Sequence, residues 1–307
     1  DAVLNATTLT FSRLVPQRNV DPLVGVSVAD GDAACRDFAR LMLPDEIDEI
    51  HHRLIIPPRL YDRMESIAAR VRAGVAHVLR TNPAIRAALA VPDATAVDVE
   101  TTRIRIPGAP RGTWAGATRP LPVASFDSTD GVFVMAAKQA RRLYLDRQSA
   151  LVYDATHPCE APAAYEALTS NAYIYPGLRC AYLLLGMAWR PFADASYDDA
   201  SLVSRFGYLI GHELSHTNLN HPYDVGISEL TKHYPCASTR DEAFADILGT
   251  LGIIHTGLIN ASQVCEHVSQ TWCARVPLGM NNCLGQSHPL PNVRGDALCE
   301  TLRNMQL

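Results

Sequence analysis

Apolar residues that recur three and four positions apart predict several helices in this chain. The clearest run begins after the two prolines at 57–58 and ends before Asn82, which predicts one long amphipathic helix that serves as scaffold. Its apolar face comprises Leu60, Met64, Ile67, Val71, Val75 and Val78. Further helices are expected to start near Pro44 and to cover residues 132–145.

The same spacing predicts two buried helices in the second half of the chain. The apolar face of the first comprises Leu202, Phe206, Leu209 and Ile210. Asp198 or Asp199 can cap its start. The second extends from Phe244 to Ile254, and Gly257 is a plausible stop. The two helices carry the residues on which the functional argument depends.

Alternating apolar and polar residues predict strands in two other places. Residues 97–106 alternate as one strand, and the Gly- and Pro-rich stretch that follows them predicts a seam between two lobes. Residues 170–175 and 182–185 flank Pro176-Gly177, a pattern that predicts a β-hairpin. Such a hairpin either presents an edge strand that binds an extended peptide or is plain structure, and the pattern fits both.

Composition excludes some classes of protein. The 307 residues are 48% apolar and 19% charged, as in a globular protein. A net charge of −5 without a basic run argues against nucleic acid as a partner. Apolar stretches are far shorter than the roughly 18 residues of a membrane span. We therefore expect no membrane span and a secreted chain or the ectodomain of an anchored protein.

The cysteines agree with an oxidising compartment. Eight cysteines form an even set without a Cys-x-x-Cys pair, which favours disulfides over a thiolate metal site. Asn5 and Asn260 each begin a triplet of the glycosylation type. Both features predict a secreted glycoprotein with disulfide bonds.

The segment 212–216 reads His-Glu-Leu-Ser-His and falls on the first of the two buried helices. On a helix, His212 and His216 lie on one face and can bind one metal ion, and the spacing indicates zinc. Glu213 lies beside the first ligand, where it can take a proton from a metal-bound water. The alternative is a core helix with two incidental histidines.

A catalytic zinc site generally takes a third protein ligand, which here must follow His216. One common arrangement continues the motif with a Gly at position 219 and a third His at position 222. Here Leu219 and Pro222 occupy these positions, so that subclass is excluded. Glu242 fits as the ligand, with Asp246 one turn later to hold the far nitrogen of a histidine. Two alternatives stay open: Glu229 as ligand, or Glu242 in a capping box with Thr239.

Several motifs together resemble those of the neprilysin family, the M13 metallopeptidases. In chain order they are Asn171-Ala172-Tyr173, the His-Glu-x-x-His segment at 212–216, and Glu242-x-x-Ala245-Asp246. Weaker resemblances are Cys35-Arg36-Asp37-Phe38, Gln270-Thr271-Trp272-Cys273, and His288-Pro289 followed by Arg294.

The resemblance implies a role for each matching residue. One zinc ion would lie on His212, His216 and Glu242, with Glu213 as general base and Asp246 behind a histidine ligand. Asn171 and Ala172 would hold the substrate backbone, His288 would stabilise the oxyanion, and Arg294 would bind a substrate carbonyl.

The resemblance also implies the architecture. We expect an α+β, mainly helical, thermolysin-like zincin fold whose third ligand is a glutamate, with an edge-strand hairpin and a small N-terminal helical region. Residues 1–130 are predicted to form a supporting region of helices and a strand, and 131–307 the catalytic domain. Relatives carry a large helical lid that this chain is too short to contain, so we expect a reduced form with an open cleft.

The sequence thus predicts a secreted zinc endopeptidase that cleaves peptide or protein substrates by Glu-assisted attack of a zinc-bound water. The alternative is a catalytically silent protein that keeps the zinc fold as an interaction scaffold. That alternative requires only the metal ligands, whereas Glu213 and the pair of His288 and Arg294 are what an active peptidase needs.

Overall fold

The computed structural model describes residues 56–106, 129–131, 134–135, 137–139, 141, 170–220, 225–234, 239–271 and 291–305. By contacts the chain divides into two compact units, residues 1–50 with 111–168 and residues 51–110 with 169–307. Every labelled helix and strand below belongs to the second unit, whereas the described residues between 129 and 141 belong to the first. The predicted domain boundary at residue 130 stays a prediction.

The long N-terminal helix is confirmed as α5, Pro58–Thr81. Its predicted apolar face is buried, with Met64, Val71 and Val75 fully so. Asn82 ends it as predicted, and the Asn82 side chain accepts hydrogen bonds from the backbone N–H groups of Ala84 and Ile85. The same residue therefore caps the start of α6, Pro83–Ala88.

The predicted strand at 97–106 is wrong in its first part. Pro92–Thr101 form helix α7, and β1 is only Arg103–Arg105. Pro92 at the first helical position and Asp93 in the first turn both favour a helix start. Ala96 and Val99 are buried three positions apart while Val97 is 49% exposed, so the burial has the period of a helix.

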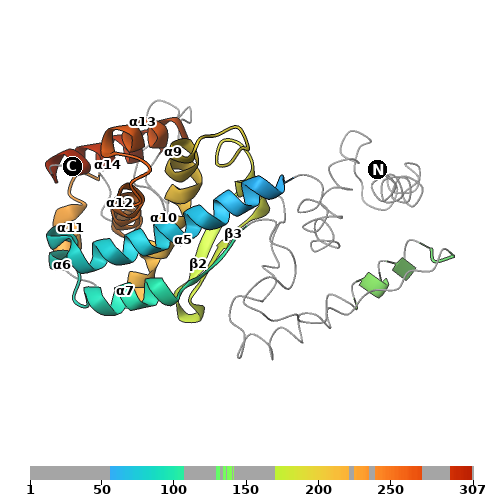
Figure 1. Cartoon of the computed structure of the whole chain (residues 1–307). Helices are drawn as coiled ribbons and strands as arrows, with labels where there is room; N and C mark the ends of the chain where they lie inside the picture. The colour runs from blue at the N-terminus through green and yellow to red at the C-terminus, as the bar shows by residue number, and fades with distance from the viewer. Residues whose placement is uncertain are drawn as a thin grey trace, which may run out of the picture. The chain divides into compact units, whose positions relative to one another are not determined.

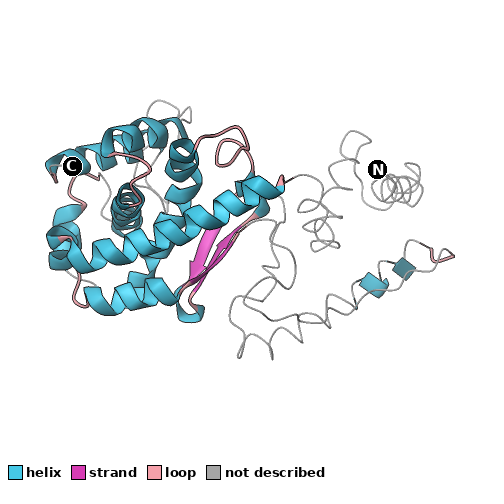
Figure 2. Cartoon of the chain, in the orientation of Figure 1, coloured by secondary structure: helices cyan, strands magenta, loops and turns pink. Residues whose placement is uncertain are grey.

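The predicted hairpin is confirmed by β2, Ala172–Tyr175, and β3, Cys180–Leu183, which pair antiparallel. The short helix η1, Pro176–Leu178, makes the turn. β1 joins β3 in parallel, which gives the order β1-β3-β2 and, among the described residues, leaves β2 at an edge of this sheet. The strands lie on one side of the helices in Figure 2, and both hairpin strands contact α10.

The helix predicted around residues 202–217 consists of successive helical segments of different types. α9, Asp199–Leu202, is capped by Asp198, whose side chain accepts a hydrogen bond from the Ser201 N–H. A π-helical turn, η3, covers Val203–Gly207, and α10 is Tyr208–Ser215. η4, His216–Asn220, follows directly. The short helix η2, Leu185–Ala188, precedes these four elements, which lead the chain into the core.

The second predicted buried helix is α12, Arg240–His255, and Gly257 follows it with a φ of 72°. This positive φ suits glycine and explains the stop. The remaining described helices are α11, Val225–Leu230, α13, Ala261–Thr271, and α14, Pro291–Asn304. A disulfide between Cys265 and Cys299 joins α13 to α14, in agreement with the expected disulfides.

Helices α5, α10 and α12 pack on one another and form the centre of this unit (Figure 1). Glycines allow the closest approach, because a Cβ atom on Gly249 of α12 would lie 2.6 Å from the backbone of Gly211 on α10. Gly74 of α5 and Gly252 of α12 meet in the same way. Backbone contact at these points sets how near the side chains of α10 and α12 come to each other.

The architecture is mainly helical with a three-stranded sheet, which agrees with the expected α+β class. The helix expected near Pro44 lies outside the described residues. Of the one expected at 132–145, residues 134–135, 137–139 and 141 are described, and they are helical. Across the part of the chain that the structure describes, no helix has the length and apolar character to cross a membrane.

Candidate metal centre

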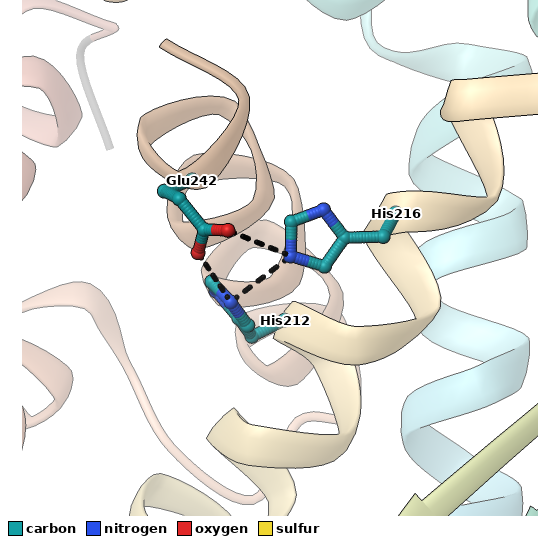
Figure 3. Close-up of side chains that lie close together, drawn as sticks. All are labelled: His212, His216 and Glu242. Atoms are coloured by element: carbon teal, nitrogen blue, oxygen red, sulfur yellow. Dashed lines mark hydrogen bonds and ion pairs between the residues drawn. The ribbon is translucent and has the colours of Figure 1, made fainter. Parts of the chain in front are cut away.

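Two helices bring three potential metal ligands together. His212 lies in α10, His216 follows its last residue, and Glu242 lies in the first turn of α12. The Nε2 atoms of the two histidines are 3.2 Å apart. Oε2 of Glu242 lies 3.1 Å from Nε2 of His212, and Oε1 lies 3.7 Å from Nε2 of His216. Figure 3 shows the three side chains pointing toward one another.

These separations fit a small tetrahedral ion. Zinc bonds of about 2.0–2.1 Å place tetrahedral ligand atoms about 3.3–3.4 Å apart, close to the distances between these three side chains. Among the described residues, His212, His216 and Glu242 form the group of three possible ligands whose donor atoms all lie within 4.8 Å of one another. Two imidazoles and a carboxylate are a donor set that zinc accepts readily. The residues therefore fit the predicted cofactor.

The geometry separates the alternatives for the third ligand. Thr239 precedes α12, but its side chain makes no capping hydrogen bond to the helix start. Glu242 instead directs its carboxylate toward the two histidines. Glu229 lies on α11 with its side chain 76% exposed and forms an ion pair with Lys232. The structure thus brings Glu242, and not Glu229, to the histidine pair.

Behind the ligands, Asp246 is the acceptor of a buried hydrogen-bond network. Nδ1 of His212 lies 2.8 Å from its Oδ1, which orients the ring so that Nε2 faces Glu242 and His216. Arg294 of α14 donates from Nε to Oδ2 at 2.6 Å and from Nη2 to Oδ1 at 2.5 Å. The hydroxyl of Tyr208 donates to Oδ1 at 2.5 Å.

Electrostatics keep this network charged. Burial raises the pKa of Asp246, but Arg294 and His212 outweigh burial and hold that pKa well below its usual range. Burial lowers the pKa of Arg294, but Asp246 outweighs it and raises the pKa above its ordinary value. For His212, burial lowers the pKa, yet hydrogen bonds with Asp246 and Glu242 raise it to about 9. Because Nε2 of His212 must be unprotonated to bind a metal ion, this raised pKa means that metal binding competes with protonation of the ring.

The other predicted site residues lie as follows. Glu213 is buried beside His212 on α10, with 8% of its surface exposed. Ala172 begins the edge strand β2, and its backbone N–H donates to the side chain of Asn171, which is exposed. Arg294 is 3% exposed and directs its guanidinium at Asp246. His288 lies outside the described residues, and its role and those of the residues above stay predictions.

Tyr208 was not identified by sequence reasoning. The one available signal is its position four residues before His212, which places both side chains on the same face of α10. That spacing indicates a neighbour of His212 but not a contact with α12, because the contact depends on how closely the two helices pack.

Comparison with known proteins shows the fold. No protein-family model and no curated protein matches the sequence. A solved structure, that of PepO from Lactobacillus rhamnosis HN001 (DR20), is similar, with a TM-score of 0.58 and 13% identical residues. The match covers 89% of this chain and 48% of that chain, so this chain spans about half the length of PepO. At this identity the likeness shows the fold alone: the matched part of this chain has the fold of PepO.

Proposed function

We propose that this chain is a secreted, neprilysin-like zinc endopeptidase that hydrolyses peptide bonds. The observation that carries the proposal is the convergence of two Nε2 atoms and one carboxylate, from α10 and α12, at distances suited to zinc. The similar solved structure, PepO, is an M13 peptidase, the family that the motifs resemble, and that family depends on zinc. The fold and the donor set thus favour the same chemistry.

In this proposal, His212, His216 and Glu242 hold the ion. A bound zinc ion would act as a Lewis acid: it would lower the pKa of its bound water to about 7 and polarise the substrate carbonyl. Glu213 follows the first ligand in sequence, and as general base it takes the proton of the attacking water and gives it to the leaving amine. Asp246 keeps the Nδ1–H of His212 engaged, so that Nε2 presents its lone pair to the ion.

The substrate-binding roles follow from the same resemblance. Asn171 and Ala172 stand at the start of the edge strand, where an extended peptide can add to the sheet through its backbone. His288 would stabilise the oxyanion and Arg294 would bind a substrate carbonyl. Secretion is supported by the disulfide between Cys265 and Cys299, because such bonds persist in oxidising compartments.

The test compares the wild type with Glu213→Gln in cleavage of a peptide library and in zinc content. The amide cannot accept the proton, so we expect stoichiometric zinc and a loss of activity by several orders of magnitude. Glu229→Gln is the matched control, since it makes the same change at an exposed glutamate that pairs with Lys232 and has no role in the proposed mechanism. Zinc in a wild type that cleaves nothing would favour the silent scaffold, and equal cleavage by Glu213→Gln would move the base elsewhere.

A further inference from the structure

Tyr208 is a buried tyrosine whose hydroxyl forms a hydrogen bond within the protein. It is the first residue of α10, one turn before His212, and it is fully buried. Its hydroxyl donates to Oδ1 of Asp246 at 2.5 Å. A hydrogen bond to a charged acceptor is stronger than one between neutral groups, and burial strengthens it further.

The position of Asp246 explains why this bond matters to the metal centre. Oδ1 is shared by the Tyr208 hydroxyl, by Nδ1 of His212 and by Nη2 of Arg294. Arg294 comes from α14, whereas Tyr208 and His212 belong to the same helix. The tyrosine bond therefore fixes the carboxylate relative to α10 itself, the helix on which its histidine partner stands.

We propose that Tyr208 is a positioning residue for the metal centre. Its hydroxyl fixes the carboxylate of Asp246, and through that carboxylate it fixes the ring of His212 whose Nε2 faces Glu242 and His216 (Figure 3). The inference rests on the proposed function in that it takes His212 to be a zinc ligand. It adds a residue to the site that neither the His-Glu-x-x-His spacing nor Asp246 itself defines.

A second buried tyrosine provides a matched comparison. Tyr234 is 5% exposed, and the charges of Asp246 and Arg294 act on it, so it lies close to the same network. Within the described structure its hydroxyl has no hydrogen-bond partner. Replacing either tyrosine by phenylalanine removes one oxygen from a buried ring, but only at Tyr208 does it remove a bond to Asp246.

The experiment measures zinc affinity by competition with a chelator, at one pH, for wild type, Tyr208→Phe and Tyr234→Phe. We expect about tenfold weaker zinc binding for Tyr208→Phe, at the low end of what the loss of an outer partner of a metal ligand costs. We expect Tyr234→Phe to stay within about twofold of wild type, because it leaves no charged group without its partner. Urea unfolding in the presence of chelator checks that both variants are folded.

A second readout separates positioning from a direct role in the reaction. Peptide cleavage by Tyr208→Phe should fall at limiting free zinc and recover to the wild-type rate at saturating zinc. Unchanged zinc affinity, equal weakening in both variants, or a cleavage defect that persists at saturating zinc would each overturn the inference. A wild type that does not bind zinc would overturn the proposed function together with it, whereas a failed inference leaves the wild-type zinc content intact.

Discussion

At the residue scale, the centre balances its buried charges in pairs. Asp246 is fully buried, which is tolerated because Arg294 forms a two-point ion pair with it and His212 adds a third contact. Because Arg294 balances the charge of Asp246, Glu242 is the carboxylate that remains directed at the two Nε2 atoms. The histidines and Glu242 thus offer a divalent ion one formal negative charge, as in a typical catalytic zinc site.

Glu242 provides the clearest prediction at this scale. Glu242→Ala should abolish stoichiometric zinc binding, since two histidines alone make an incomplete site. Glu229→Ala should bind zinc as the wild type does, because Glu229 is exposed and paired with Lys232. Metal analysis of both purified variants after dialysis against micromolar zinc makes the comparison. The reverse result, with zinc lost only from Glu229→Ala, would show that the ligand assignment is wrong.

The sequence predicts the features of the site that depend on residue spacing along one helix. It does not predict side-chain contacts between two helices. The i, i+4 relation of His212 and His216 is a property of any helix, so it was predictable without tertiary structure. Glu242 and Asp246 were assigned from helix pattern together with the family resemblance. The contact of Tyr208 with Asp246 spans two helices, and only their close packing creates it.

At the element scale, strong periodicity predicted structure well and weak periodicity did not. The long apolar stripe of α5 and the Pro-Gly turn of the hairpin were sufficient to place both elements. In α7, alternating valines suggested a strand, yet Pro92 and Asp93 start a helix and β1 begins only at Arg103. A short segment with both signals is decided by its ends and by its packing against α5.

The glycine contact between α10 and α12 gives a prediction at this scale. A Cβ atom on Gly249 would lie 2.6 Å from the backbone carbonyl carbon of Gly211 and from the backbone nitrogen of His212. Gly249→Ala must therefore push α12 away from α10, which separates Glu242 and Asp246 from the histidines. We expect a loss of about 1–3 kcal/mol in the free energy of unfolding, typical of overpacking, together with weaker zinc binding.

Gly177→Ala is the control for this change, because no heavy atom lies within 4 Å of its added Cβ. It should unfold and bind zinc much as the wild type does. Urea unfolding in the presence of chelator and zinc competition give the two quantities. If Gly249→Ala retained wild-type zinc affinity, the glycine contact would not set the geometry of the centre.

At the scale of the whole molecule, the centre exists only when separate parts of the chain are packed together. The ligands come from α10 and α12, the support of Asp246 comes from α14, and α5 packs against both ligand helices. The disulfide between Cys265 and Cys299 ties α14 to α13 and so restricts the helix that carries Arg294. Metal binding and folding of the unit formed by residues 51–110 and 169–307 should therefore be linked.

This linkage gives the last prediction. An ion that binds the folded chain and not the unfolded one stabilises it by about 2.7 kcal/mol when free zinc is 100 times its dissociation constant. Buffered zinc should thus raise the free energy of unfolding of the wild type by roughly that amount over the value in chelator. Glu229→Ala should gain the same increment, and Glu242→Ala, which lacks the third ligand, should gain almost none. An equal gain in Glu242→Ala would mean that zinc stabilises the chain from another place, because the increment would then not depend on bringing α12 to the two histidines of α10.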